Sequence, residues 1–342
     1  MKLLIRRFVF VGASVLLVST ILNAGPSGYH VIKTIKLGGD GGWDYLTASG
    51  GRVYISRGTH VMVVDADTGA VVGDIPNTNG VHGIAIAADM DKGFISDGRD
   101  NNVTIFDVKT LKVLGTAPAG KNPDAIIYDP ASKRVFAFNG SSKDATAIDA
   151  KTGTVAGTIP LGGKPEFAVA DEKGHVFVNI EDTSEIVQLS SDKLAIEARW
   201  KIAPGEEPSG LAMDRKNRRL FSVCSNKLMV VLNADNGSVI TALPIGAGTD
   251  AAGFDPETGF AFSSNGGDGT LTVVHEDSPN KFAVVENVPT LRRARTMALD
   301  AKTHQIYTVT AEFGQAPAPT TAQPRPRAPM VLGSFTLLIL SR

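Results

Sequence analysis

Residues 124–160 read DAIIYDPASKRVFAFNGSSKDATAIDAKTGTVAGTIP, and this stretch decides the fold. Pro130, Asn139-Gly140 and Gly153 mark three turns, and glycine suits the positive φ that a tight turn requires. Strands of about five residues with turn signals every 8–12 residues indicate an all-β protein. The four segments between the turns are residues 124–129, 134–138, 145–149 and 154–159.

The same four-part unit recurs with a period of 42 residues. Asp65, Asp107 and Asp149 end equivalent segments at this spacing (107 − 65 = 149 − 107 = 42), where we expect each Asp to cap a turn. A fixed period of this size indicates repeated units that share one core. Seven second strands carry an aromatic residue at the matching place, which we expect to pack between neighbouring sheets: Tyr54, Phe94, Phe136, Phe177, Phe221, Phe262 and Tyr307.

Seven repeats of four strands predict an all-β, seven-bladed β-propeller with four-stranded antiparallel blades. The two ends of the chain fit one shared blade. Residues 29–37 resemble a fourth strand without the first three, and residues 334–340 resemble a third strand without a fourth. We therefore expect residues 25–342 to form one domain, in which the N-terminal strand closes the last blade.

The first 24 residues have the parts of a secretory signal peptide. Lys2, Arg6 and Arg7 form the positive region, residues 8–22 are apolar, and residues 22–24 are an acceptable cleavage site. The alternative is an uncleaved anchor, but the apolar run is short for a span of about 20 residues. We predict a periplasmic or secreted product with no membrane span after cleavage.

Charge and cysteine content argue against several partners and cofactors. Without residues 1–24, Lys plus Arg falls from 34 to 31 against 35 Asp plus Glu, so the net charge becomes about −4. This balance disfavours nucleic acid, whose partners carry clustered Lys and Arg. Cys224 is the single cysteine and no C-x-x-C-H motif exists, so we expect neither a disulfide within the chain nor haem. We expect a monomer.

The last blade contains an insertion at residues 312–330, with PAPTTAQPRPRAP at its centre. Proline disfavours both helix and strand ladder, so the segment is predicted to be an extended, polyproline-like loop. Two interpretations stay open: a solvated insertion, or a Pro-x-x-Pro segment that binds a partner.

The repeat also predicts which side chains meet at the central channel. The first strand of each propeller blade lines the channel, and its first residue lies at the channel mouth. A ring of carboxylates, imidazole and guanidinium at one opening is a ligand-binding hypothesis; a wet, solvated rim is the alternative. The predicted mouth residues are Asp44, His82, Asp124, Glu166, Ser209, Asp250 and Arg295.

Two chemistries follow from such a ring. Carboxylate oxygens suit a hard divalent cation, so if the ring holds a metal we expect Ca²⁺ on Asp124, Glu166 and Asp250. No cofactor is otherwise evident. Like charges held close also raise a carboxyl pKa and prepare it for acid–base work.

No sequence motif supports covalent or zinc catalysis, since G-x-S-x-G and H-E-x-x-H are both absent. We therefore predict no catalytic residue and no enzyme activity. Glycine-rich runs at 38–42 and 266–269 lack the Lys-Ser/Thr of a phosphate loop and are predicted to be turns. Residues 292–295, Arg-Arg-Ala-Arg, are the one basic cluster and form either a solvated loop or an anion-binding patch near the mouth.

Residues 130–136 and 147–160 resemble the bacterial YVTN β-propeller repeat, and degraded forms of its tetrapeptide stand at 54–57, 136–139, 262–265 and 307–310. The likeness covers residues 29–342 and is close to the YncE-like group of secreted or periplasmic propellers. It implies the fold and leaves the activity open, because propellers host many functions.

Three functions remain in view. The first is a non-catalytic scaffold that binds a protein, peptide or small ligand at the channel face. The second is a channel-mouth hydrolase, with or without a bound cation, because similar seven-bladed propellers include lactone hydrolases. The third is DNA binding, which the YncE-like resemblance brings in and the acidic balance opposes.

Overall fold

The computed structural model describes residues 26–39, 41–318, 320 and 326–342. The predicted signal peptide, residues 1–24, and much of the centre of the Pro-rich insertion lie outside the described residues. Within the described part of the chain, no helix has the length and apolar character needed to cross a bilayer.

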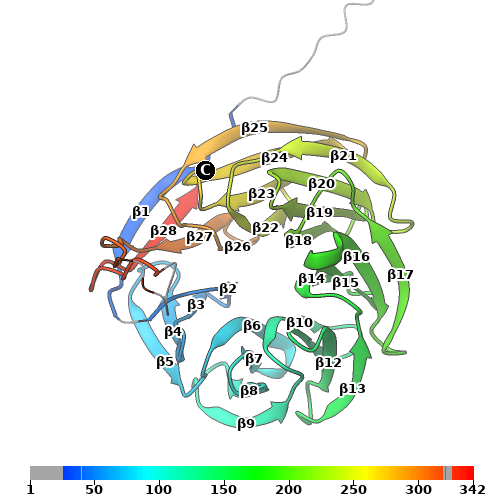
Figure 1. Cartoon of the computed structure of the whole chain (residues 1–342), viewed down its shortest axis with the longest axis horizontal. Helices are drawn as coiled ribbons and strands as arrows, with labels where there is room; N and C mark the ends of the chain where they lie inside the picture. The colour runs from blue at the N-terminus through cyan, green and yellow to red at the C-terminus, as the bar shows by residue number, and fades with distance from the viewer. Residues whose placement is uncertain (1–25, 40, 319, 321–325) are drawn as a thin grey trace, which may run out of the picture.

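Seven four-stranded antiparallel sheets stand around a central opening, so the chain is a seven-bladed β-propeller (Figure 1). Each blade runs outward from the channel, and six blades use four consecutive strands. The predicted fold class is confirmed. Short 3₁₀ turns, η1 (Ala88–Met90) and η2 (Glu181–Thr183), accompany the strands.

The innermost strands are β2 (Leu46–Ser49), β6 (Val81–Ala87), β10 (Pro123–Asp129), β14 (Pro165–Ala170), β18 (Pro208–Asp214), β22 (Thr249–Asp255) and β26 (Met297–Asp300). The second strands are β3 (Arg52–Ser56), β7 (Lys92–Asp97), β11 (Arg134–Asn139), β15 (His175–Ile180), β19 (Arg219–Cys224), β23 (Phe260–Asn265) and β27 (Gln305–Thr310). The third strands are β4 (His60–Asp65), β8 (Asn102–Asp107), β12 (Asp144–Asp149), β16 (Glu185–Ser190), β20 (Leu228–Asn233), β24 (Thr270–Ser278) and β28 (Thr336–Ser341). The outermost strands are β5 (Val71–Pro76), β9 (Val113–Pro118), β13 (Val155–Pro160), β17 (Ala195–Lys201), β21 (Val239–Pro244), β25 (Lys281–Pro289) and β1 (His30–Lys36).

The core lies between neighbouring blades. All seven aromatics of the second-strand column are fully buried, as predicted. Around Phe136, for example, the cluster joins residues of its own blade to Ala168 and Val178 of the next blade. Apolar burial of this kind is the main favourable term in folding, and each ring contributes a large area.

The last blade is built from both ends of the chain. Its order is β26-β27-β28-β1, and β1 pairs antiparallel with β28 from His30–Ser341 to Lys36–Thr336. Figure 1 shows the blue N-terminal strand lying along the red C-terminal strand. The predicted closure is confirmed, and it leaves β1 as an outer edge like that of every other blade.

The turn between the third and fourth strands is held by the predicted aspartates. The Oδ1 atom of Asp149 accepts hydrogen bonds from the N–H and hydroxyl of Thr152, at 2.7 and 2.9 Å. Asp65 and Asp107 make the same pair of bonds to Thr68 and Thr110. These residues therefore act in turn formation.

Candidate functional site at the channel mouth

The mouth residues lie where the innermost strands interrupt their pairing. Asp124 is the second residue of β10, and the ladder with β11 is irregular between Pro123 and Ile126. The same irregularity begins after the first residue of β6, β14, β18 and β22. A bulge of this kind locally twists a strand and re-aims its side chains. Five of the seven predicted mouth residues occupy this position.

Buried polar residues of the second strands fix these bulges. The hydroxyl of Ser96 accepts from the N–H of Gly83 at 2.8 Å and donates to the carbonyl of Asp124 in the next blade. The amide of Asn179 donates to the carbonyls of Ser209 and Gly210 in the same manner. Each such side chain satisfies backbone groups that the broken ladder leaves free.

A cavity of about 270 Å³ opens at the mouth, and it is strongly acidic. Six of the seven predicted residues line it, while His82 stands behind Asp44. Glu181 and Glu207 add two further carboxylates. The lining residues are Asp44, Tyr45, Asp124, Glu166, Glu181, Glu207, Ser209, Ser225, Thr249, Asp250 and Arg295.

Hydrogen bonds and ion pairs join six of the predicted residues into one network, in which Asp124 takes part through an ion pair with His82 at 3.6 Å. The Nδ1 atom of His82 lies 2.5 Å from Oδ2 of Asp44, and Arg295 donates to Oδ1 of the same carboxylate at 2.5 Å. The other guanidinium nitrogen of Arg295 donates to Asp250 at 2.5 Å, and the Ser209 hydroxyl lies 3.2 Å from Asp250. The sequence predicted that these side chains meet, and they do.

Asp44 and His82 form a charged pair. Burial would raise the pKa of Asp44, but the hydrogen bond from His82 and the nearby Arg295 outweigh it and lower that pKa. Burial would lower the pKa of His82, but the bond to Asp44 and the charge of Asp124 raise it instead. An imidazole backed by a carboxylate is held in one orientation and favours the protonated form.

The other carboxyls at the mouth bind protons more tightly than usual. Burial raises the pKa of Asp124 to about 6 and that of Asp250 to about 7. Burial and the charge of Asp124 raise the pKa of Glu166 to about 8, although Lys164 lies 2.6 Å away. The cavity therefore holds more carboxylate than its own cations neutralise.

Tyr45 is the one buried aromatic side chain in the lining. It is 9% exposed, and its ring stacks on Phe167 at a centroid distance of 4.5 Å. Its hydroxyl has no hydrogen-bond partner among the described residues. Burial and the surrounding carboxylates raise its pKa well above the ordinary value, so the hydroxyl stays protonated and is an available donor.

The geometry favours a different metal set from the one expected. Ligand atoms of Asp44, His82 and Asp124 lie within 4.8 Å of one another, and among the described residues no group with Glu166 or Asp250 meets this distance. A set of two carboxylates and one imidazole fits a borderline divalent ion such as Zn²⁺ as well as Ca²⁺.

Sequence reasoning missed six residues of this site: Tyr45, Lys164, Glu181, Glu207, Ser225 and Thr249. Tyr45 and Lys164 stand one and two positions from predicted residues, so their proximity was readable from the chain. Glu181 belongs to η2, and Glu207 directly precedes β18. The carboxylate of Glu181 forms an ion pair with Lys164, and Lys164 also forms one with Glu166.

Comparisons with known proteins support the fold and leave the function open. No family model matches the chain, and no curated protein sequence does. Among solved structures, the chain is similar to a Kuenenia stuttgartiensis hydrazine synthase structure, with a TM-score of 0.67, 14% identity, and coverage of 78% of this chain and 92% of that one.

Two further solved structures are similar to this chain. A chain in a mitotic checkpoint complex structure has a TM-score of 0.72 and 14% identity, with 100% of this chain and 99% of that chain covered. The structure of U3-55K has a TM-score of 0.73 and 7% identity, with 92% and 99% covered. At these identities the likeness shows the propeller fold alone.

Proposed function

We propose that this propeller is a non-catalytic binding scaffold of the secreted, YncE-like kind, and that its channel mouth binds a ligand with a positively charged head group. The observation that carries the proposal is the cavity itself, in which six carboxylates and one unpartnered tyrosine hydroxyl face the charge of Arg295. A small primary amine, a guanidinium, or a Lys or Arg side chain of a peptide has the matching chemistry.

The cations already present support this choice. Arg295 is engaged by Asp44 and Asp250, and Lys164 by Glu166 and Glu181. Asp124 has only His82, at 3.6 Å, as a cationic neighbour within ion-pair distance among the described residues. A bound cation would therefore find carboxylate oxygens whose own counter-charge is incomplete.

Calorimetric titration with agmatine, a guanidinium-bearing amine, tests the proposal. We expect agmatine to bind and neutral N-butylurea to bind at least about ten-fold more weakly, because each decade corresponds to about 1.4 kcal/mol. Asp124→Asn with Glu166→Gln should weaken agmatine binding by a similar factor. The control variant is Asp192→Asn with Glu257→Gln, which makes the same charge change at two exposed positions elsewhere and should leave agmatine binding unaltered. Equal binding of agmatine and N-butylurea would contradict the proposal.

A divalent cation is the second candidate ligand, because Asp44, His82 and Asp124 present their ligand atoms within 4.8 Å. Thermal unfolding with EDTA, Ca²⁺ or Zn²⁺ tests it, since an ion that binds the native state raises the midpoint. We expect any shift to disappear in Asp124→Asn. A midpoint that no ion changes removes this candidate.

Hydrolysis is supported by one observation only. A histidine 2.5 Å from a partly buried carboxylate is an arrangement found in general acid–base sites. A panel of lactone substrates assayed with the parent protein and with His82→Gln separates the two functions. Turnover that His82→Gln abolishes would replace the scaffold proposal with a hydrolase.

Secretion is part of the proposal and rests on residues 1–24. Fusion of residues 1–40 to a phosphatase that is active only outside the cytoplasm tests it. We expect activity from this fusion and none from a fusion in which Lys2, Arg6 and Arg7 are replaced by Glu.

A further inference from the structure

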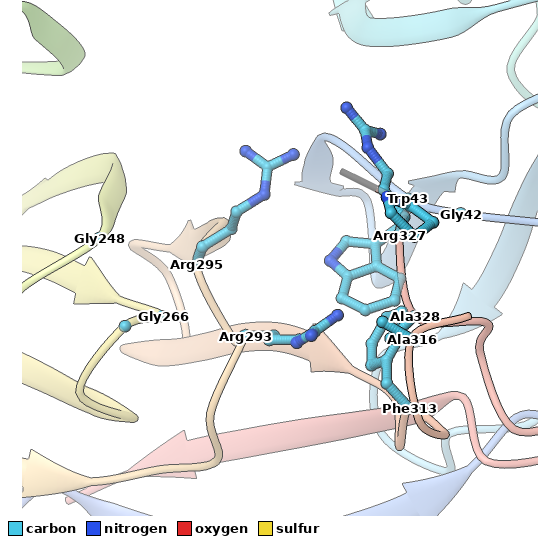
Figure 2. Close-up of a pocket in the computed structure, with 12 residues that line it drawn as sticks. Gly42, Trp43, Gly248, Gly266, Arg293, Arg295, Phe313, Ala316, Arg327 and Ala328 are labelled. Atoms are coloured by element: carbon cyan, nitrogen blue, oxygen red, sulfur yellow. The ribbon is translucent and has the colours of Figure 1, made fainter. Parts of the chain in front are cut away.

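A second and larger cavity lies beside the channel mouth. Its volume is about 760 Å³, within the range of small-molecule sites. One wall comes from the segment before β2, another from the loop before β26, and a third from the Pro-rich insertion. Its defining side chains are Trp43, Arg293, Phe313 and Arg327, and we call it the arginine–tryptophan pocket (Figure 2).

Aromatic rings and guanidinium groups pack against one another at one wall, where the buried Phe335 and Arg57 lie outside the lining. The Trp43 ring packs at 6.0 Å from Phe313 and 5.4 Å from Phe335, measured between centroids. Arg293 lies 3.7 Å over Phe313, and Arg57 lies 3.6 Å over Phe335. The Trp43 ring is tilted by 49° to Phe313 and by 46° to Phe335, and the cation–π contacts help to hold the two phenyl rings in place.

The charge of the pocket is one-sided. Among the described residues that line it, Arg293, Arg295 and Arg327 are cationic and none is Asp or Glu. Arg295 is already bound to Asp44 and Asp250, but Arg293 and Arg327 have no carboxylate partner within the described part of the chain. Two guanidinium groups therefore face the pocket without a counter-ion among the residues that the structure describes.

Donors also outnumber acceptors in the pocket's side chains. The indole N–H of Trp43 is buried and has no hydrogen-bond acceptor among the described residues. In Figure 2 this nitrogen is turned toward Arg293 and Arg295. An indole N–H and a guanidinium are donors only, so an occupant that satisfies them must bring acceptor oxygens.

We propose that the arginine–tryptophan pocket binds an organic anion, with its carboxylate against Arg293 and Arg327 and a flat apolar body against Trp43 and Phe313. The sequence offered a solvated loop and an anion-binding patch as readings of residues 292–295. The structure favours the second, because Arg293 lines an aromatic cavity. This site is separate from the cationic-ligand site at the channel mouth.

Phenylacetate is the minimal probe, and neutral phenylacetamide is its control. The chain has two tryptophans, and Trp200 stacks on Phe177 in another blade, so Trp200→Phe leaves Trp43 as the single reporter. We expect phenylacetate to change Trp43 fluorescence saturably, and phenylacetamide to bind at least about ten-fold more weakly, because only the anion forms charge-assisted hydrogen bonds.

Two substitutions probe the charge and the space independently. Arg293→Gln should remove the preference for the anion. Arg342→Gln is the control, because Arg342 follows β28 and its guanidinium also lies over an aromatic ring. This control should leave the preference for the anion intact. A side chain at Gly42 would extend into open space, so Gly42→Leu should block the pocket. Gly115 on β9 has the same open surroundings, so Gly115→Leu is its control.

The outcomes are decisive in both directions. Weaker phenylacetate binding in folded Arg293→Gln or Gly42→Leu, with both controls unchanged, supports the proposal. Absence of saturable binding to the parent protein overturns it, as does equal affinity for phenylacetate and phenylacetamide. Asp124→Asn with Glu166→Gln should keep phenylacetate binding, so this site and the channel-mouth function can fail separately.

Discussion

Arg295 is the side chain on which most of the channel mouth depends. Its guanidinium pairs with Asp44 and Asp250 and also lines the arginine–tryptophan pocket, so one cation serves two cavities. When one partner of an ion pair that is shielded from water is removed, the charge of the other partner is left without compensation.

We expect Arg295→Gln to lower stability by about 1–2 kcal/mol at pH 8. This is less than the roughly 3–5 kcal/mol of a fully buried broken pair, because the Arg295 side chain is partly exposed. The loss should shrink at pH 5.5, where Asp250, whose pKa is about 7, is already protonated. Urea unfolding at the two pH values measures both figures. An equal loss at both would show that Arg295 acts through packing.

The raised mouth carboxyls give stability a defined pH dependence. The pKa values of Asp124, Asp250 and Glu166, at about 6, 7 and 8, exceed the unfolded values of roughly 4. The native state then holds more protons than the unfolded state between about pH 4 and pH 8, so stability falls as pH rises through this window. We expect a higher unfolding midpoint at pH 5.5 than at pH 8.

His82 adds to this slope, since its raised pKa contributes stability that is lost as pH rises through the folded value. Asp44 has a lowered pKa, and its contribution is lost only as pH falls below the window. Asp124→Asn, Glu166→Gln and Asp250→Asn together should flatten the profile. Asp97 and Glu276 lie outside the channel mouth, and burial raises the pKa of each to about 7. These two residues should therefore keep some dependence of stability on pH in the triple variant. An unchanged slope in the triple variant would contradict the assignment.

At the residue scale, the repeat predicted which side chains meet and left open how they pair. The 42-residue spacing places His82, Asp124 and Asp250 at one opening without any knowledge of rotamers, and the repeat pattern adds Asp44 and Arg295. It does not say that Arg295 reaches two of them, since that depends on side-chain direction at a bulge. It also does not show that Tyr45 is buried with a free hydroxyl.

At the element scale, the second strands position the site through buried polar side chains. Ser56 accepts hydrogen bonds from the N–H groups of Asp44 and Tyr45, at 3.0 and 2.9 Å, as Ser96 does for Gly83. The signal was present in the sequence as a polar residue two positions after the column aromatic. It follows a run of buried apolar residues in each strand.

We expect Ser96→Ala to cost about 1–3 kcal/mol, because it leaves a buried N–H and a buried carbonyl without a partner. It should also weaken agmatine binding, since the carbonyl it releases belongs to Asp124. Ser190→Ala is the matched control, because Ser190 is buried in β16 and bonds a turn N–H instead. Unfolding free energy and calorimetry provide the two measurements. Equal effects of both substitutions on agmatine would rule out a positioning role for Ser96.

Strand positions were predictable because turn chemistry and aromatic spacing are local properties. The interrupted ladders at the start of β6, β10, β14, β18 and β22 were not, since a bulge depends on both partner strands. Gly210 illustrates the difficulty. A Cβ there would lie 2.5 Å from the backbone of Ala252 in the next blade, a contact that no local pattern reveals.

At the scale of the whole molecule, one blade joins the two ends of the chain. A disulfide between Lys36→Cys and Thr336→Cys, which are paired in register, should stabilise the ring more than one between Thr146→Cys and Thr158→Cys. Both pairs join an exposed outer strand to a buried third strand, but the closed segments span 300 and 12 residues (336 − 36 and 158 − 146).

Loop-closure entropy predicts about 3 kcal/mol more stabilisation for the longer segment. Unfolding midpoints of each variant with and without a reducing agent measure it, and the buried Cys224 is common to all samples. Equal gains from the two disulfides would indicate that the closing blade opens no more readily than the others.

The architecture could be predicted almost completely, and the function could not. Blade number, closure and the channel all follow from the period and the incomplete repeats at each end. The arginine–tryptophan pocket escaped sequence reasoning because its lining comes from five separate segments: those before β2, β22 and β26, the turn after β23, and the Pro-rich insertion. The insertion has no counterpart in the other repeats.

The closing blade has a consequence for the order of events during synthesis. β1 pairs with β28 alone, and 300 residues separate Lys36 from Thr336. At a translation rate of about 5–20 residues per second, β1 waits roughly 15–60 s for its neighbour to be made. Lys33 and Lys36 are then placed to discourage wrong pairing, because charged side chains protect an open strand edge while the nascent chain is incomplete.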